Sequence, residues 1–436
     1  MRIKLEFGRN GLWIDVPDRN LAAVLDRPDR PAAPDTAAAV ERAIGSPIGC
    51  EPLEQLARGS RSACVVISDC TRPVNHSAIL PPIIRGLERA GVRDVKILIG
   101  NGLHRPMRND EIERSVGPEI AAAYPIHNHF GRDERANVCV GRTSRGTPVC
   151  LDRHYVEADF RVITSLVEPH MYAGFSGGRK AIAIGIASLE TIRVIHSPLF
   201  LEHEGLRAGS LASNIFHHEA CEIARMAPAQ FAVNVTNNHA RKLVGAYAGD
   251  MLRSHEAAIE AVRADSVQYL DGPVDIAITT NAGYPADLNL YQSPKGMQSG
   301  SNIVKQGGTV IFAAELSEGL GGREFSDFIL RCPSPEEAMR RMLSPGFFVI
   351  DQWGLESICK ALRKAQFMLY TTGLAPDVVS RCFLTPIASV EEGIRTALQR
   401  LGPDATIAVV PKGPYIIGTF KGAGGHGKEG VPGLQA

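Results

Sequence analysis

The feature that most constrains the fold is a series of short apolar runs, each followed by a polar loop that contains glycine or proline. The first three runs are residues 63–67 (ACVVI), 95–99 (VKILI) and 160–167 (FRVITSLV). Segments with helical patterning separate them, and strands alternating with helices are typical of a mostly parallel sheet. In such sheets the ligand crevice lies beyond the carboxyl ends of the strands. The sequence therefore predicts an α/β fold with polar site residues at that edge.

The same alternation restarts in the second half of the chain, after Asp271-Gly272-Pro273 interrupts it. Strands are predicted at 274–279, 309–314, 367–372 and 406–410, with a weaker candidate at 382–384 and a clear helix at 389–401. We therefore predict two α/β domains with mostly parallel sheets, residues 1–270 and a Rossmann-like domain at 271–412, with the active site in the cleft between them. Residues 413–436 form a tail, and its glycine-rich end, 422–436, is expected to be disordered.

Further elements follow from turn and capping signals. A hairpin is predicted for residues 2–16 around Gly8-Arg9-Asn10-Gly11. Residues 18–59 are rich in Ala and Pro, with helical stretches but no predicted strand. The other predictions are helices at 36–44, 52–58, 77–90, 109–115 (capped by Asn109), 188–195 and 252–263, a helix opening at Asn214, and strands at 138–140, 147–151, 231–236 and 242–247.

Composition excludes several classes of protein. Lys plus Arg equals Asp plus Glu, 47 of each, so no net field attracts nucleic acid or a membrane surface. No apolar run approaches the ~20 residues of a membrane span, and the N-terminus lacks the pattern of a signal peptide. A cytoplasmic location is expected. The nine cysteines include no CxxC pair, which favours reduced, mostly buried thiols.

The segment Glu168–Lys180 (EPHMYAGFSGGRK) concentrates groups that can perform chemistry. It follows a buried strand and brings a histidine, a glycine pair and a lysine into one turn region. Small residues allow backbone amides to approach a phosphate, but glycines also serve tight turns, and the segment alone does not decide between the two. A Walker A loop is excluded, because Ala181 stands where Ser or Thr would bind magnesium.

Other polar residues at predicted strand ends add to this segment. His104 and His170 follow neighbouring strands, and imidazole exchanges protons near neutral pH. Arg72 and Lys295 suit a carboxylate clamp, the alternative being surface ion pairs. Adjacent helical residues point in different directions, so His217, His218 and Glu219 are interpreted as cap and core residues. His127 and His129 lack a third partner and are interpreted as structural.

Taken in order, these segments resemble the nickel-dependent lactate racemase family. The resemblance covers nearly the whole chain. Its motifs are SDCTRP (68–73), GNGLHRP (100–106), EPHMYAGFSGGRK (168–180), His196, YQSPKG (291–296) and Asp351-Gln352-Trp353. No single motif is specific, but their shared order is.

The resemblance implies a nickel-pincer nucleotide, pyridinium-3,5-bisthiocarboxylic acid mononucleotide, as cofactor. Lys180 matches the lysine that binds it covalently, and His196 matches the protein ligand of nickel. His104 and His170 match the two general acid/bases, one for each face of the substrate. The positions that match or are assigned to cofactor binding are Asp69, Ser176, Gly177, Gly178 and Tyr291, and those for substrate binding are Arg72, Gln292, Lys295 and Trp353.

The implied activity is racemisation or epimerisation of a 2-hydroxy acid. Its C2–H is weakly acidic, so hydride removal to a flat 2-oxo acid and return to either face is the easier route. Lactate and larger malate-like or sugar acids are all candidate substrates, and cofactor-making enzymes are the implied partners. The rival interpretation is a non-catalytic nickel- or cofactor-binding protein.

Overall fold

The computed structural model describes residues 1–421, and the predicted disorder of 422–436 lies outside the described residues. The described chain forms two compact units. We call residues 29–168 and 172–264 the N-terminal unit, and residues 1–28, 169–171 and 265–421 the C-terminal unit. The main change of unit therefore falls at Asp265, whereas the predicted second domain begins at residue 271. Residues 1–28, assigned from sequence to the first domain, pack in the C-terminal unit instead.

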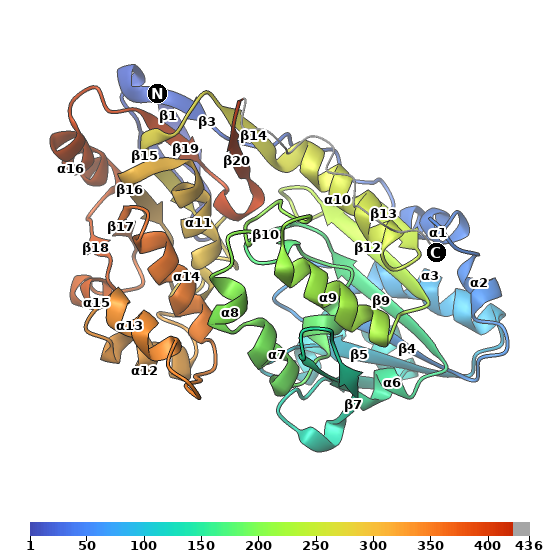
Figure 1. Ribbon diagram of the computed structural model, residues 1–436. Helices are drawn as coiled ribbons and strands as arrows, with labels where there is room; N and C mark the ends of the chain where they lie inside the picture. The colour runs from blue at the N-terminus through green and yellow to red at the C-terminus, as the bar shows by residue number, and fades with distance from the viewer. Residues whose placement is uncertain (422–436) are drawn as a thin grey trace. The chain divides into compact units, whose positions relative to one another are not determined.

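The N-terminal unit is built on a six-stranded sheet in the order β13-β12-β9-β4-β5-β6 (Figure 1). The strands are β4 (Ser62–Ser68), β5 (Asp94–Gly100), β6 (Ile126–Asn128), β9 (Phe160–Leu166), β12 (Phe231–Asn237) and β13 (Leu243–Gly249). All neighbours are parallel except β12 and β13. From β4 the chain builds outward through β5 to one edge and through β9 to the other. The topological switch point therefore lies between β4 and β9, so the loops after these strands flank the expected ligand crevice.

One face of this sheet carries a large apolar core. Alternate residues of β4, Ala63, Val65 and Ile67, point into it, as the two-residue period of a strand requires. Five helices cover this face: α1 (Thr36–Gly45), α2 (Leu53–Leu56), α3 (His76–Arg89), α4 (Asn109–Val116) and α5 (Pro118–Ala123). Arg108 rather than Asn109 is the N-cap of α4. The other face contacts a π-helical turn, η3 (Ala181–Gly185), that directly follows Lys180.

The remaining elements of the N-terminal unit surround that second face. They are the hairpin β7 (Asn137–Arg142) and β8 (Pro148–Asp152), η2 (Glu134–Ala136), β11 (Gly174–Phe175), α6 (Arg153–Val156), α7 (Leu189–Ile195), α8 (Pro198–Leu201), α9 (Ile215–Met226) and α10 (Arg253–Ser266), whose last two residues belong to the other unit. Ser188 caps α7 and Asn214 caps α9, each through a side-chain bond to a backbone N–H of the first turn. Both helix starts were predicted from sequence and are confirmed.

The C-terminal unit contains a second six-stranded sheet, all parallel, in the order β18-β17-β16-β15-β19-β3. Its strands are β3 (Leu21–Val24), β15 (Val274–Thr280), β16 (Val304–Ala313), β17 (Gln366–Tyr370), β18 (Thr385–Pro386) and β19 (Ile407–Val410). Ile276 and Ile278 point into one apolar cluster and Ala277 into another, so β15 is buried on both faces. The prediction of an α/β fold with mostly parallel sheets is confirmed.

Helices cover both faces of the second sheet. One face holds α11 (Pro294–Ile303), α12 (Arg323–Arg331), α13 (Pro335–Met342), α14 (Gln352–Leu362) and α15 (Pro376–Arg381). The other holds α16 (Val390–Leu401) and the predicted hairpin, β1 (Arg2–Leu5) and β2 (Leu12–Asp15). Shorter elements are η1 (Asp18–Asn20), β10 (Pro169–His170), η4 (Leu290–Gln292), η5 (Gly413–Tyr415), and β14 (Val267–Leu270) paired with β20 (Ile417–Phe420).

Two strand predictions were wrong. No strand was predicted within 18–59, yet β3 pairs with β19. The weak candidate at 382–384 is the turn that follows α15, with Cys382 as the C-cap, and the strand lies at Thr385–Pro386.

The prediction of reduced cysteines was also wrong for one pair. Cys139 of β7 and Cys150 of β8 form a disulfide, because the antiparallel register places them directly opposite each other. The free cysteines include five buried ones and Cys50 and Cys70, which are not buried.

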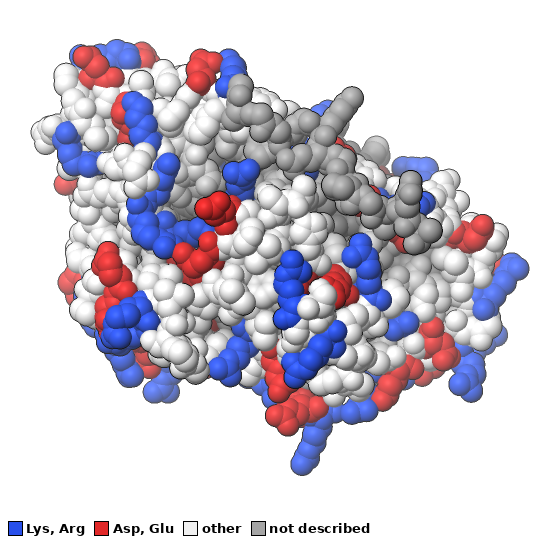
Figure 2. Space-filling view, viewed as in Figure 1, with Lys and Arg blue, Asp and Glu red and all other residues white. Residues whose placement is uncertain are grey.

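Surface charge is mixed, and Figure 2 shows Lys and Arg interspersed with Asp and Glu on the face in view. Within residues 1–421, every helix is too short or too polar to cross a bilayer.

Candidate active site

A histidine–aspartate pair lies where β4 and β5 end. Nδ1 of His104 is 2.6 Å from Oδ2 of Asp69, and the other carboxylate oxygen accepts the Thr71 hydroxyl at 2.6 Å. An ionised carboxylate only accepts hydrogen bonds, so Nδ1 donates to Asp69 and Nε2 is the ring nitrogen that is left to exchange a proton. The His104 side chain is 41% exposed, whereas that of Asp69 is 7% exposed. The pair therefore presents an accessible imidazole on a buried carboxylate.

Asp69 is ionised at neutral pH despite its burial. Burial alone would raise the pKa of this carboxyl, but hydrogen bonds from His104 and Thr71 outweigh it and hold the pKa below its usual value. The charge of Arg72 acts in the same direction. Arg72 is half-buried, and its backbone N–H donates to the Asp69 carbonyl at 3.2 Å. The loop after β4 thus places a guanidinium beside the histidine–aspartate pair.

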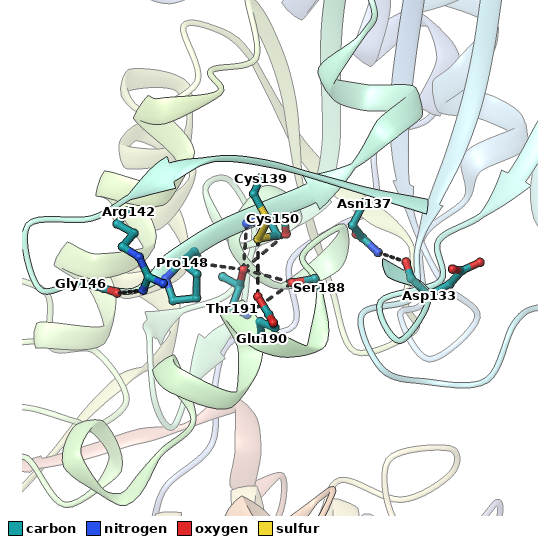
Figure 3. Close-up of a disulfide and its surroundings, with 10 residues drawn as sticks. All are labelled: Asp133, Asn137, Cys139, Arg142, Gly146, Pro148, Cys150, Ser188, Glu190 and Thr191. Atoms are coloured by element: carbon teal, nitrogen blue, oxygen red, sulfur yellow. Dashed lines mark hydrogen bonds between the residues drawn. A yellow bond between two sulfur atoms is a disulfide. The ribbon is translucent and has the colours of Figure 1, made fainter. Parts of the chain in front are cut away.

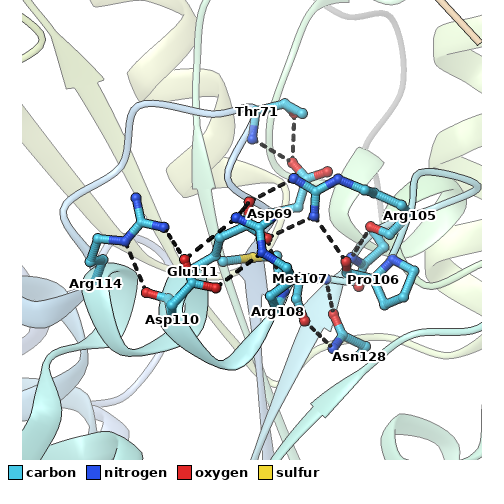
Figure 4. Close-up of polar contacts among 11 residues, drawn as sticks. Asp69, Thr71, Arg105, Pro106, Met107, Arg108, Asp110, Glu111, Arg114 and Asn128 are labelled. Carbon is cyan, nitrogen blue, oxygen red and sulfur yellow. Dashed lines mark hydrogen bonds and ion pairs between the residues drawn. The ribbon is translucent and has the colours of Figure 1, made fainter.

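The loop that carries His104 is held from several sides. The His104 N–H donates to the Asn101 carbonyl at 3.0 Å, and Gly102 N–H donates to Gly185 at the end of η3 at 2.8 Å. Arg105 forms a two-pronged ion pair with Glu111 of α4, at 2.7 and 2.6 Å (Figure 4). Hydrogen bonds from Arg105 lower the pKa of Glu111 to about 2. The histidine therefore lies on a loop fixed to both η3 and α4.

The Ser176-Gly177-Gly178 turn is shaped by the protein around it. The Ser176 hydroxyl donates to Leu166 at 2.8 Å and accepts from the Glu168 N–H at 2.9 Å. Gly178 N–H donates to Ser165 Oγ at 2.8 Å. Both glycines have positive φ, +78° and +52°. A Cβ on Gly178 would lie 2.4 Å from His255, and one on Gly177 would lie 2.9 Å from Val167. Packing and backbone conformation thus require glycine at both positions.

Arg179 and His255 close this turn from beneath. Arg179 is fully buried, donates to the Ala173 carbonyl at 2.7 Å, and its Nη1 lies 3.3 Å from Nδ1 of His255. Nε2 of His255 lies 2.8 Å from the Ser176 carbonyl. Burial, with the Arg179 charge, lowers the pKa of His255 to about 3, so the ring is neutral and donates to Ser176. We call Arg179, His255 and the Ser176 carbonyl the clasp; it fixes the backbone immediately before Lys180.

Lys180 and His196 lie around the ring of Phe216. The Lys180 amine is 5.8 Å from the centre of that ring, and the His196 ring meets it edge-on at 5.2 Å. His196 is the C-cap residue of α7, and its Nδ1 lies 3.2 Å from the Ile192 carbonyl. Burial, and then the charge of Lys180, lower the pKa of His196 to about 3. His196 is therefore a neutral imidazole whose Nδ1–H donates to the backbone, which leaves Nε2 with the lone pair that a metal requires.

In the C-terminal unit, a second group of predicted residues follows β15. Asn281 organises it: its amide donates to the Gln292 carbonyl at 3.1 Å and its oxygen accepts from Gly296 N–H at 3.0 Å. Lys295, in the first turn of α11, donates to Gln292 Oε1 at 3.3 Å. A Cβ on Gly296 would lie 2.2 Å from the Thr280 carbonyl, so glycine lets α11 approach the strand. One amine and one amide are thus held together beyond the carboxyl end of β15.

Tyr291 and Trp353 form the aromatic part of this group. The Trp353 indole N–H donates to Tyr291 Oη at 2.9 Å. A Cβ on Gly354 would lie 2.8 Å from the Tyr291 ring, so the glycine of α14 makes room for it. His170 lies in β10 within the same unit and is 8% exposed.

The structure thus brings the predicted site residues together within each unit. Asp69, Arg72 and His104 form one group and Lys180 and His196 another in the N-terminal unit, and Tyr291, Gln292, Lys295 and Trp353 form a group in the C-terminal unit. Sequence reasoning missed the clasp and Asn281. Arg179 stands inside the segment that was singled out, but nothing local marks its partner, 76 residues later.

Comparison with known proteins defines the class. Family models described as the lactate racemase N-terminal domain and the lactate racemase C-terminal domain match residues 7–209 and 270–417. The lactate racemase of Lactiplantibacillus plantarum is 33% identical over 382 residues, 87% of this chain and 90% of its own length. That of Thermoanaerobacterium thermosaccharolyticum is 31% identical over 420 residues, 95% of this chain and 98% of its own. These matches define an enzyme of the isomerase class.

Solved structures agree. The lactate racemase apoprotein of T. thermosaccharolyticum superposes with a TM-score of 0.91 at 31% identity, covering 96% of this chain and 100% of that one. A Thermotoga maritima protein, 18% identical with a TM-score of 0.66, shares the fold. The chain belongs to the lactate racemase family.

Proposed function

We propose that this enzyme racemises or epimerises a 2-hydroxy acid by way of the 2-oxo acid, with a nickel-pincer nucleotide attached to Lys180. The observation that carries the proposal is the state of His196. A buried histidine with a pKa of about 3, whose Nδ1–H donates to a backbone carbonyl, offers Nε2 as a metal ligand at neutral pH. The Lys180 amine and the His196 ring both lie near the Phe216 ring. These two residues fit the group; when bound, it supplies a hydride acceptor that returns hydride to C2.

His104 is proposed to take and return the proton of the substrate hydroxyl. Nε2 is the nitrogen proposed to accept that proton, since Nδ1 donates to the Asp69 carboxylate at 2.6 Å, and this carboxylate stabilises the imidazolium that forms. Loss of the hydroxyl proton to His104, together with loss of the C2 hydride to the acceptor that the cofactor would supply, makes C2 the carbonyl carbon of the 2-oxo acid. His170 is proposed to do the same for the opposite enantiomer, because each face of the planar 2-oxo acid requires its own acid.

Cationic and amide groups are proposed to hold the substrate. Arg72 next to Asp69 and Lys295 next to Gln292 suit a carboxylate and the adjacent oxygen. The Trp353–Tyr291 pair is proposed to contact the substrate together with Gln292 and Lys295. Lactate is the substrate named for the relatives, and we extend the proposal to larger 2-hydroxy acids. A panel of 2-hydroxy acids tested by polarimetry separates them.

The glycine turn is proposed to shape the attachment of Lys180 rather than to cradle a phosphate. The amides of Ser176, Gly178 and Lys180 already donate within the protein, to Glu168, Ser165 and Gly177. The space that a Cβ would fill at either glycine is occupied by protein atoms. Of the two interpretations that the sequence left open, the geometry favours the tight turn, and we assign Ser176, Gly177 and Gly178 to that role.

The decisive experiment coexpresses the chain with the cofactor-making enzymes and measures intact mass, nickel content and racemisation. We expect a mass adduct in the wild type that is absent in Lys180→Ala and retained in Lys242→Ala, which removes an exposed lysine of the same unit. His104→Ala and His170→Ala are expected to keep adduct and nickel but to lose racemisation.

Two results would contradict the proposal. A wild type without any adduct under these conditions removes the cofactor assignment. A wild type that carries adduct and nickel but racemises none of the panel supports the rival interpretation of a non-catalytic cofactor-binding protein.

A further inference from the structure

The disulfide joins the partly exposed strand β7 to the mostly buried strand β8. Cys139 and Cys150 are opposite residues of β7 and β8, with a sequence separation of 11 (Figure 3). Their surroundings differ sharply. Cys139 is exposed, whereas Cys150 is 2% exposed. One sulfur is therefore accessible to a reagent in solution, and the other is shielded by the protein.

Cys150 is also tied to the start of α7. Its carbonyl accepts the Ser188 N–H at 2.8 Å, and its N–H donates to Thr191 Oγ1 at 3.1 Å. The same hydroxyl donates to the Pro148 carbonyl at 2.7 Å. Through these bonds the strand β8 holds the N-cap and first turn of α7. The helix is seven residues long, and its C-cap is His196.

A carboxylate lies beside the buried sulfur. Glu190 Oε2 is 3.9 Å from Cys150 Sγ, and Glu190 itself is exposed in the first turn of α7. A negative charge so placed opposes a second negative charge on the sulfur and also repels an approaching thiolate. The hairpin thus combines an accessible sulfur, a shielded sulfur and a negative charge that would slow the attack of a thiolate on the disulfide.

We propose that Cys139–Cys150 is a reversible thiol–disulfide exchange site whose state is read by the first turn of α7. An external thiolate attacks the exposed Cys139 sulfur, the Cys139–Cys150 bond breaks, and Cys150 leaves with the electron pair and takes a proton. A second external thiol then attacks the mixed disulfide and releases Cys139 as a thiol. In total the protein disulfide and two thiols give two protein thiols and one external disulfide, so two electrons and two protons are transferred.

The exchange matters for α7 because the disulfide links β7 covalently to β8, the strand that bonds the first turn of that helix. With the bond closed, β8 is held against β7 and presents a fixed edge to Ser188 and Thr191. With the bond open, the backbone bonds of Cys150 rest on a looser strand, so the first turn of α7 opens more often. The proposal does not depend on the racemase activity, since the hairpin and helix are part of the fold itself.

The test uses the folded full-length protein without cofactor. Native alkylation followed by peptide mapping counts thiols at 139 and 150 before and after treatment with reduced glutathione or dithiothreitol. We expect neither cysteine to be alkylated in the oxidised protein, both to be alkylated after reduction, and oxidised glutathione to close the bond again. Amide hydrogen exchange of 188–191 should accelerate at least several-fold on reduction, while that of β4 stays unchanged.

Variants sharpen the test. Cys139→Ser should show the fast exchange at 188–191 with or without reductant. Glu190→Gln should be reduced several-fold faster than the wild type, because the opposing charge is gone. Glu119→Gln is the matched control, since it removes an exposed first-turn glutamate from another short helix of the same unit, and it should leave the rate unchanged.

Three outcomes would overturn the proposal. The bond resists excess dithiothreitol until the protein unfolds, which makes it a structural link. Both cysteines are alkylated without reductant and never join under oxidised glutathione. In the third outcome, the reduced protein binds one zinc ion that prevents the disulfide from forming again. The two sulfurs and the Glu190 carboxylate, whose ligand atoms lie within 4.8 Å of one another, would then be a metal site.

Discussion

Replacing Asp69 by Asn tests the chemistry of the N-terminal unit most directly. The change keeps the size of the side chain and an oxygen that can accept from His104, but it removes the charge that would face the imidazolium. Hydrogen bonds to a charged group contribute about 1.5–3 kcal/mol. At 1.36 kcal/mol per tenfold in rate, kcat should fall about 10- to 150-fold. An amide that turns its NH2 toward the ring would impose the opposite tautomer and enlarge the loss.

The assay measures initial rates of racemisation from each enantiomer by chiral chromatography, on protein whose cofactor loading is matched by intact mass. We expect kcat to carry the loss and KM to stay within about threefold, because the charge acts when the proton moves rather than when substrate binds. Asp152→Asn is the matched control. Asp152 also pairs with a histidine, His129, at 2.8 Å, but in the buried interior of the same unit.

The control should lower thermal stability and leave the kcat of folded, loaded enzyme near that of the wild type. The reasoning is refuted if loaded Asp69→Asn has a kcat within twofold of the wild type. It is also refuted if Asp152→Asn and Asp69→Asn lose kcat equally, because the effect would then be a general consequence of weakening a buried histidine–aspartate pair.

Three further predictions concern the supporting structure. Gly178→Ala should lower the free energy of unfolding, measured by urea titration, by about 2–4 kcal/mol, because of the positive φ and the contact with His255. The control Gly91→Ala, with φ of +92° and open space around it, should lower it by about 1 kcal/mol. Equal losses would show that the contact with His255 does not contribute. Trp353→Phe and Tyr291→Phe should each raise KM up to about tenfold, because each removes the same hydrogen bond. If the free-energy effects of the two changes add in the double variant, this hydrogen bond is unimportant. His255→Gln should flatten the pH dependence of stability. The pKa of His255 is about 3 in the folded protein and 6.5 in the unfolded chain, so the unfolded chain binds the proton first as the pH falls. The wild type therefore loses up to about 1.4 kcal/mol of stability per pH unit from this group between those two values. Unchanged slopes in chemical denaturation between pH 6.5 and 4 would contradict this pKa.

Much of the fold follows from local sequence. The buried strands β4, β5 and β9 are apolar runs with clear polar ends, and the caps Ser188 and Asn214 mark their helices. The loops that follow those strands were expected to meet at one sheet edge, which is why Arg72, His104 and His170 were predicted there from the strand pattern. Asp69 was added only by the family resemblance. The hydrogen-bond pattern around Asp69 was not predictable, because it depends on side-chain positions across two loops.

The misses have a common physical cause, which is dependence on distant partners. The segment LAAV of β3 has no apolar alternation of its own and becomes a strand only beside β19. Cys139 and Cys150 meet because of the register of a hairpin that contains a bulge next to Cys139. In the sequence, a glycine pair is expected both in a phosphate cradle and in a tight turn. The tight turn is favoured only by the contact with His255, which lies far along the chain.

The position of β3 has a consequence for how the protein is made. This strand is synthesised long before its partner, β19, because Leu21 pairs with Ile407. The sheet of the C-terminal unit therefore cannot be completed until residues 407–410 have left the ribosome, and such long-range pairing is slow. Until β3 pairs with it, the strand β19, which is buried in the complete sheet, is an uncovered edge. A chain that starts at residue 29 would keep that edge permanently, and aggregation during expression is its expected fate.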